Sequence, residues 1–151
     1  GWVEAPEFII EAMESIQNST ILCPDTLHQM ALTNFINSAL ADNSLKNYVK
    51  ETSRLYKIAA EKTVKTIKDK FNFRIIVPDG GLYIFMSVER NGAKFVEEIL
   101  KETGVSFVPG WGFGRTGNNA IRISYGPLVE NLKKIEIGLT RVSDYLRNGR
   151  K

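Results

Sequence analysis

The feature that most constrains this fold is a long stretch of helical period that starts at Ser44. Apolar or small side chains recur there at three- and four-residue steps, with Lys, Glu and Arg between them. They are Leu45, Tyr48, Val49, Thr52, Leu55, Ala59, Thr63, Val64, Ile67 and Phe71. The pattern predicts one helix of about 26 residues, roughly 39 Å long. Because this exceeds the usual helix length of a small domain, we expect the helix to join two bodies.

Two shorter helices are predicted before the long one. Pro6 suits a first helical turn, and apolar residues at helical spacing carry a helix over residues 6–17. A second helix begins near Asp25, which can cap free N–H groups, and is interrupted at residues 42–44. Both helices have one apolar face and no predicted strand beside them. We therefore expect these faces to pack on something that this chain does not contain.

After residue 72 the apolar period changes from helical to alternating. Strands are predicted at residues 73–77, 82–88, 105–108 and 120–125, and helices at residues 91–103 and 128–146. The turn at residues 78–81 makes the first two strands a hairpin, and Gly104 suits the end of the first helix. A right-handed crossover is expected between the second and third strands. The fold class predicted for this part is α+β (α/β), with a small mixed sheet flanked by helices.

Composition excludes several classes of protein. The 151 residues are 43% hydrophobic and 25% charged, the balance of a globular domain. One cysteine, Cys23, and one histidine, His28, are too few for an internal disulfide or a soft-metal site, so we expect no metal and a reducing, cytoplasmic compartment. No apolar run is long enough to span a bilayer. The chain starts at Gly1 rather than Met, and we expect a cut end there.

The net charge of +3 is a weak indication of nucleic-acid binding, because 20 basic residues are interleaved with 17 acidic ones. The lysines at positions 62, 65, 68 and 70 alternate with apolar residues, which is typical of the solvated side of a helix. Cys23 and His28 are a poor nucleophile–base pair, because the sequence offers them no obvious orienting acid. We therefore expect neither nucleic acid nor membrane as a partner, and no catalytic residue in this chain.

The glycine-rich segment matches a dinucleotide-binding pattern in letters alone. Residues 112–117 read G-x-G-x-x-G, a pattern that binds pyrophosphate when a strand precedes it and a helix follows. Here a predicted strand follows, so a glycine-rich hairpin loop is favoured over a nucleotide site. Trp111 and Phe113 in this loop either cover a core or face a ligand.

Arg122 is the candidate binding residue. In the strand at residues 120–125, Ile121 and Ile123 share one face and Arg122 lies on the other. A solvated strand face is the simpler interpretation of this spacing. The alternative is a bidentate clamp for a carboxylate, because a planar guanidinium on a rigid strand can bind both oxygens.

The order of these segments resembles the C-terminal portion of class I/II pyridoxal-phosphate aminotransferases, the aspartate aminotransferase-like group of fold type I. Residues 17–31 resemble the Q...ST...P...Q-x-A stretch of that family, and residues 78–85 resemble its P-x-G-G-x-Y-x-F hairpin. Residues 104–124 resemble its G-V...P-G-x-x-F-G-x-x-G...R-I-S run. The resemblance covers nearly the whole chain.

The resemblance implies that Arg122 binds the substrate α-carboxylate and that Phe113 lies near the substrate. It also implies large-domain helices at residues 1–44, an interdomain helix at 45–72 and a small α+β domain at 73–151. Amino acids and 2-oxo acids would be the substrates. Each subunit would also contain the large domain that is missing here, and the full-length protein would be a homodimer. Pyridoxal 5'-phosphate would be the cofactor of the full-length enzyme. No S-x-x-K lysine occurs in the chain, so no cofactor-binding residue is assigned and the chain alone is expected to be inactive.

Two alternatives remain open at this point. Other members of the fold are lyases or synthases, so a different reaction on the same cofactor is possible for the whole protein. A free-standing basic α/β module that binds an anionic ligand or nucleic acid is the second alternative. It predicts binding that weakens with salt.

Overall fold

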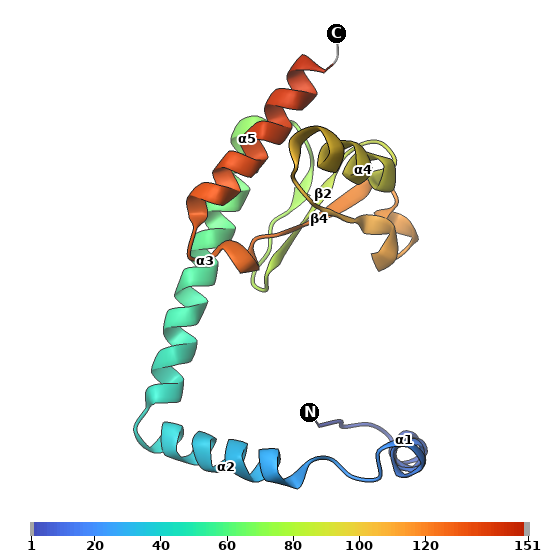
Figure 1. Ribbon diagram of the computed structural model, residues 1–151, viewed down its shortest axis with the longest axis vertical. Helices are drawn as coiled ribbons and strands as arrows, with labels where there is room; N and C mark the ends of the chain where they lie inside the picture. Colours follow the sequence, from blue (N-terminus) through green and yellow to red (C-terminus); the bar gives the residue numbers. More distant parts are fainter. Residues whose placement is uncertain (1, 150–151) are drawn as a thin grey trace. The chain divides into compact units, whose positions relative to one another are not determined.

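Three helices precede a region of short strands and two further helices in the computed structural model, which describes residues 2–149 (Figure 1). The α-helices are α1 (Glu7–Thr20), α2 (Thr26–Ala41), α3 (Ser44–Lys70), α4 (Gly92–Thr103) and α5 (Leu132–Asn148). The strands are β1 (Ile75–Ile76), β2 (Tyr83–Ser87), β3 (Val108–Pro109) and β4 (Ala120–Ser124). Short 3₁₀ turns are η1 (Gly110–Phe113), η2 (Arg115–Gly117) and η3 (Gly126–Leu128). These elements confirm the α+β class.

The chain divides into two units, residues 1–48 and residues 49–151. The boundary lies inside α3, a single helix of 27 residues. The finer division into residues 1–44, 45–72 and 73–151 stays a prediction. Each unit is described below by itself.

The first unit consists of α1, α2 and the start of α3. Asp25 caps α2, where its side chain accepts a hydrogen bond from the backbone N–H of His28 at 3.2 Å. Helix α1 was expected to end at residue 17 but continues to Thr20. The hydroxyls of Ser19 and Thr20 donate to carbonyl oxygens one turn earlier, so these residues extend the helix rather than close it. No residue of α1 is buried, and α2 buries only Ala39.

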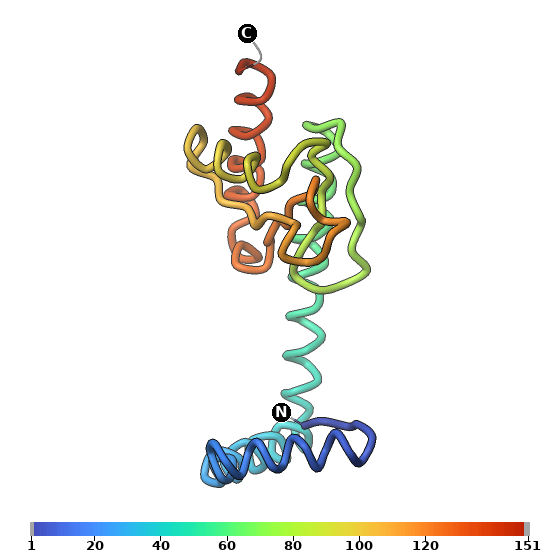
Figure 2. Tube along the Cα trace, turned by 90° about the vertical axis from the view of Figure 1, so that its right-hand side faces the viewer, coloured from blue at the N-terminus to red at the C-terminus, as the bar shows by residue number. Residues whose placement is uncertain are grey.

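The second unit contains a four-stranded sheet in the order β1-β2-β4-β3. All three pairs of neighbouring strands are antiparallel, which corrects the expected mixed sheet. Strands β2 and β3 both run antiparallel to β4 and so are parallel to each other, but β4 lies between them. The predicted hairpin is confirmed by the pairing of Ile75 with Met86, and Figure 2 shows its turn as the light green loop. Strand β1 is shorter than expected, although Ser87 still donates its backbone N–H to the carbonyl of Arg74 at 2.8 Å.

One face of this sheet is covered by the core. Ile84 and Met86 of β2 and Ile121 and Ile123 of β4 are buried against apolar residues of three helices. These residues are Ala59 and Ile67 of α3, Phe95 and Ile99 of α4, and Ile135, Leu139 and Val142 of α5. The other face of the sheet is therefore available for polar side chains.

The ends of the helices around this core carry defined caps. Asn91 accepts from the N–H of Lys94 at the start of α4, and Gly104 ends this helix with φ +70°. At the end of α3, the carbonyl of Lys70 accepts hydrogen bonds from Ser143 and Arg147 of α5. None of the helices among the described residues is long and apolar enough to cross a membrane.

Candidate functional site

The candidate site lies on the face of the sheet that points away from the core. Alternation along β4 buries Ile121 and Ile123 and places Arg122 on the opposite face, as the sequence predicts. Across the sheet, Phe85 of β2 and Val108 of β3 are the direct neighbours of Arg122. Tyr83, two residues before Phe85 on β2, is a diagonal neighbour of Arg122 on the same face. The site is thus built on paired strands.

Two aromatic rings contact the guanidinium of Arg122. Its Cζ lies 4.2 Å from the ring centre of Tyr83 and 4.7 Å from that of Phe113. Phe113 in turn meets Phe85 edge to face, with ring centres 5.5 Å apart and planes at 88°. Arg122 therefore lies in a small aromatic cluster rather than on a fully solvated strand face.

Arg122 has no acidic partner in this cluster. It takes part in none of the ion pairs found among the described residues. Its Nε is buried and has no hydrogen-bond partner. Because no carboxylate of the described residues neutralises this guanidinium, its terminal N–H donors are free to bind an anion.

The segment that carries Phe113 is closed by two glycines. A Cβ added to Gly117 would lie 2.1 Å from the carbonyl oxygen of Gly110, and one added to Gly110 would lie 2.4 Å from that of Gly117. Gly114 has φ +121°, a conformation that favours glycine. The segment joins the antiparallel strands β3 and β4, which confirms the interpretation as a hairpin loop. Because β4 rather than an α-helix follows, the loop offers no helix N-terminus to a phosphate.

Of the two aromatics in this loop, neither belongs to the core. Trp111 is exposed, and Phe113 is exposed on the side that does not contact Arg122 and Phe85. Core coverage, the first of the two interpretations, is therefore wrong for both residues. Phe113 instead covers one face of the Arg122 guanidinium.

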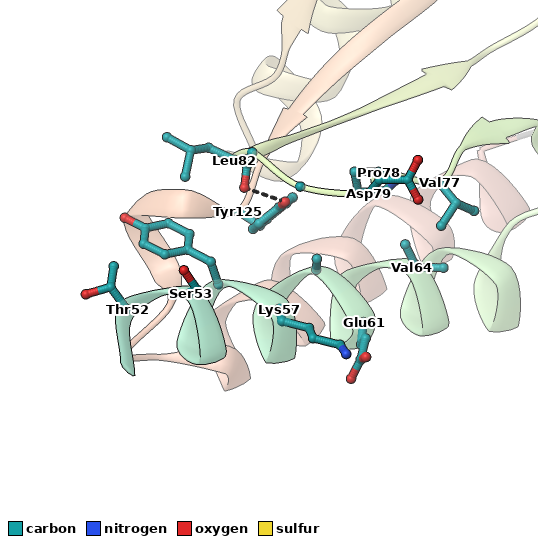
Figure 3. Close-up of a pocket in the computed structure, with 14 residues that line it drawn as sticks. Thr52, Ser53, Lys57, Glu61, Val64, Val77, Pro78, Asp79, Leu82 and Tyr125 are labelled. Carbon is teal, nitrogen blue, oxygen red and sulfur yellow. Dashed lines mark hydrogen bonds between the residues drawn. The ribbon is translucent and has the colours of Figure 1, made fainter. Parts of the chain in front are cut away.

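A separate cavity of about 780 Å³ lies between α3 and the 78–81 turn (Figure 3). Its charged side chains are Lys57, Glu61 and Asp79, and it does not include Arg122 or Phe113. Tyr125 closes one wall, where its hydroxyl donates to the carbonyl of Gly81 at 2.8 Å. Burial raises the pKa of Tyr125, so this hydroxyl stays protonated and serves to hold the turn.

The other sequence candidates do not gather into a site. Asp25 provides the acid that the sequence did not suggest for His28, with Oδ2 at 2.6 Å from Nδ1. This hydrogen bond lowers the pKa of Asp25, but both residues are exposed and the carboxylate also caps α2. Lys62 pairs with Glu136 at 2.6 Å, consistent with the solvated side of a helix. Among the described residues, no group of three or more His, Cys, Asp or Glu side chains could hold a metal ion.

Sequence reasoning missed Tyr83 and Phe85. Both were assigned to the hairpin strand and given no role. Their alternation with buried Ile84 and Met86 places them on the outer face, and this signal was available. What the sequence did not supply was the register that pairs β2 with β4 and sets Phe85 opposite Arg122.

Comparison with known proteins identifies relatives of one kind, although no protein-family model matches the chain. The chain is 32% identical over 146 residues to the (5-formylfuran-3-yl)methyl phosphate transaminase of Methanocaldococcus jannaschii, covering 97% of this chain and 37% of that protein. It is 30% identical to the aspartate aminotransferase of Pyrococcus abyssi, covering 97% of this chain and 36% of that protein.

A solved structure gives the same result. The chain superimposes on the aromatic aminotransferase from Pyrococcus horikoshii OT3 with a TM-score of 0.82 and 30% identity, covering 97% of this chain and 38% of that one. The chain thus spans little more than a third of the length of the relatives it matches. The similarity to each of these relatives extends over 97% of this chain.

Proposed function

Since the chain belongs to the aspartate aminotransferase-like family of fold type I, we propose that it is the C-terminal part of a pyridoxal-phosphate-dependent aminotransferase. The proposed reaction transfers an amino group between an amino acid and a 2-oxo acid. In this proposal the chain binds and orients the substrate. The complete protein, a homodimer, holds the cofactor elsewhere.

The environment of Arg122 is the observation that carries this proposal. A guanidinium with aromatic rings at 4.2 Å and 4.7 Å and no acidic partner is prepared to bind an anion. A carboxylate matches it best, because two parallel N–H···O bonds fix both oxygens of a planar group. Amino acids and 2-oxo acids both carry an α-carboxylate, so one clamp serves both halves of the reaction. Phe113 lies beside that clamp and excludes water from one side of it.

The glycine-rich loop does not fit the phosphate of the cofactor. That phosphate would need a row of free N–H groups, such as a helix N-terminus provides. The glycine-rich loop is instead closed by the approach of Gly110 and Gly117, and β4 follows it. The chain also contains no S-x-x-K lysine. We therefore assign no cofactor-binding residue to this chain.

The exposed apolar side chains of the first unit support the proposed domain division. Phe8 and Ile16 of α1 and Leu27 and Met30 of α2 are all exposed. We infer that residues 1–44 belong to the large domain, whose other elements cover these side chains. Residues 45–72 would then link the domains, and residues 73–151 would form most of the small domain.

The experiment is the Arg122→Ala substitution in the complete holoenzyme. We expect kcat/KM for amino acids to fall by about 10²-fold or more, because two charge-assisted hydrogen bonds to the carboxylate are lost. Cofactor content, read from its absorbance, should stay at the wild-type level. Arg141→Ala, which removes an exposed arginine of α5, is the matched control and should leave both values unchanged. Wild-type kcat/KM in the Arg122→Ala enzyme would overturn the proposed role of Arg122.

The coding DNA upstream of the Gly1 codon offers an independent test. An in-frame S-x-x-K lysine there would support the proposed enzyme, because that lysine is the group that the chain lacks. A stop codon directly upstream would contradict it and leave a free-standing module as the better explanation.

A further inference from the structure

We propose that Tyr83 and Phe113 are positioning residues that hold the Arg122 guanidinium between their rings, so that only its terminal edge meets the substrate carboxylate. The inference rests on the proposed function and adds residues and a binding geometry to it. The two side chains come from different elements, Tyr83 from β2 and Phe113 from η1. Neither acts on the reacting atoms.

The rings restrict how a ligand can approach Arg122. Each lies within the distance at which a cation and an aromatic face attract each other, 4.2 Å for Tyr83 and 4.7 Å for Phe113. A guanidinium donates hydrogen bonds in its own plane, so rings that pack on its flat surface would leave donation intact and limit the tilt of the plane. A carboxylate must then approach along an edge.

The buried Nε decides which edge is open. A guanidinium offers a carboxylate either its side edge, which includes Nε, or its terminal edge with the two Nη atoms. Nε of Arg122 is buried without a partner, so the side edge is closed to an incoming ligand. The terminal edge remains, and it predicts an end-on, bidentate carboxylate.

Each ring is itself held in place. Tyr83 lies on a strand paired with β4, and Phe113 packs edge to face on Phe85 at 5.5 Å. The close approach of Gly110 and Gly117 fixes the base of the loop that carries Phe113. The side chains of both residues are nevertheless about half exposed, Tyr83 at 44% and Phe113 at 51%. Their contribution to the core is therefore small, and their contact with Arg122 is the specific feature that they share.

The arrangement is tested directly by NMR of the Arg122 side chain in this 151-residue chain. The Nε–H signal, identified by its loss in Arg122→Lys, should lie at higher field than an exposed arginine signal, because it is near two ring faces. Tyr83→Leu and Phe113→Leu should each move it towards the exposed position. Tyr83→Phe keeps the ring and should restore the wild-type shift.

Trp111→Leu is the matched control for this measurement. It removes an exposed aromatic of the same loop that is not among the rings found in contact with Arg122. The Arg122 signal should not move in this variant. An Arg122 signal at the exposed position in the wild-type chain, or one that Tyr83→Leu and Phe113→Leu leave in place, would overturn the proposal.

A double-mutant cycle in the complete holoenzyme tests the consequence for binding. Tyr83→Leu should raise KM for the amino acid about 3- to 30-fold and change kcat little, because a misoriented clamp weakens substrate binding. The same substitution in the Arg122→Ala enzyme should have no further effect, since the residue that it positions is gone. Tyr83→Phe should restore the wild-type KM.

Different results would contradict the proposed function and the positioning role. If Arg122→Ala leaves KM unchanged, the proposed function fails. If Arg122→Ala raises KM but Tyr83→Leu acts equally in both backgrounds, the clamp stands and the positioning role is wrong.

Discussion

Amphipathic helices in the two units differ in whether their apolar faces are buried. Helix α1 carries Phe8, Ile9, Met13 and Ile16 at helical spacing and buries no residue. Helix α4 carries Phe95, Val96, Ile99 and Leu100 in the same kind of pattern and buries Phe95 and Ile99 completely. The local sequence signal is similar in both. The difference is that α4 has a sheet and α5 to pack against, so a helical pattern predicts an apolar face but not what covers it.

Separating the two units should give the largest difference in stability between two parts of the chain. A chain of residues 44–151 should unfold cooperatively on heating, because the core lies within residues 49–151. A peptide of residues 1–43 should show little helical circular dichroism, since helices of this length without a packed face are marginal in water. Binding of a hydrophobic fluorescent dye should be less than half as strong for residues 44–151 as for the whole chain. A stably helical 1–43 peptide, or an unfolded 44–151 chain, would reverse the comparison.

Two phenylalanine substitutions test the same contrast within the intact chain. Phe95 is 0% exposed and Phe8 is 71% exposed. Phe95→Ala should lower the free energy of unfolding by about 3–5 kcal/mol, because it leaves a cavity in the core. Phe8→Ala should change it by less than about 0.5 kcal/mol. Chemical denaturation of both variants measures the difference, and equal losses would mean that α1 also contributes to a core.

The glycine-rich loop provides the next test within the second unit. Gly117→Ala should cost about 1–3 kcal/mol or more, because the new methyl group would overlap the backbone of Gly110. Gly112→Ala is the matched control in the same loop, where an added Cβ meets no atom within 4 Å. Thermal unfolding of both variants measures this difference in stability. Equal stability of the two variants would show that the loop is not closed by its glycines.

The sequence predicted features that depend on local spacing. The long helix follows from a continuous period after Ser44, and Asn43 breaks the chain before it with φ +61°. The outward direction of Arg122 follows from alternation along one strand. Asp25, Asn91 and Gly104 were recognisable as helix boundaries because caps use a few residue types.

Features that depend on strand order could not be predicted. The sheet was expected to be mixed, because the pattern does not reveal that β4 lies between β2 and β3. The same missing register hid the contact between Tyr83 and Arg122. The clamp role itself came from resemblance to a family, since spacing alone favoured a solvated face. The aromatic neighbours of Arg122 support that proposed role.

The smallest expected effect on stability is predicted by comparing one carboxylate from each unit. Hydrogen bonds from Arg90 hold the pKa of Glu98 below its usual value, and a hydrogen bond from His28 does the same for Asp25. The Arg90 pair, with N···O distances of 2.8 Å and 3.0 Å, joins the turn before α4 to that helix, and α4 packs on the core. Asp25 contacts only residues of α2, as its cap and as a partner of His28, and α2 buries a single alanine. Global unfolding should therefore respond to Glu98 and not to Asp25.

Glu98→Gln should lower stability at pH 7 by less than about 1 kcal/mol, because both partners are partly exposed. A depressed carboxylate pKa stabilises the folded state above the unfolded value of about 4.3, and that contribution is lost as the pH falls through the lower folded value. The difference in Tm between wild type and Glu98→Gln should therefore stay constant from pH 7 down to about 4.3 and narrow as the pH falls further. Asp25→Asn, which keeps a capping oxygen, should leave Tm unchanged over the same range. A pH-dependent loss from Asp25→Asn equal to that from Glu98→Gln would mean that the first unit unfolds together with the core.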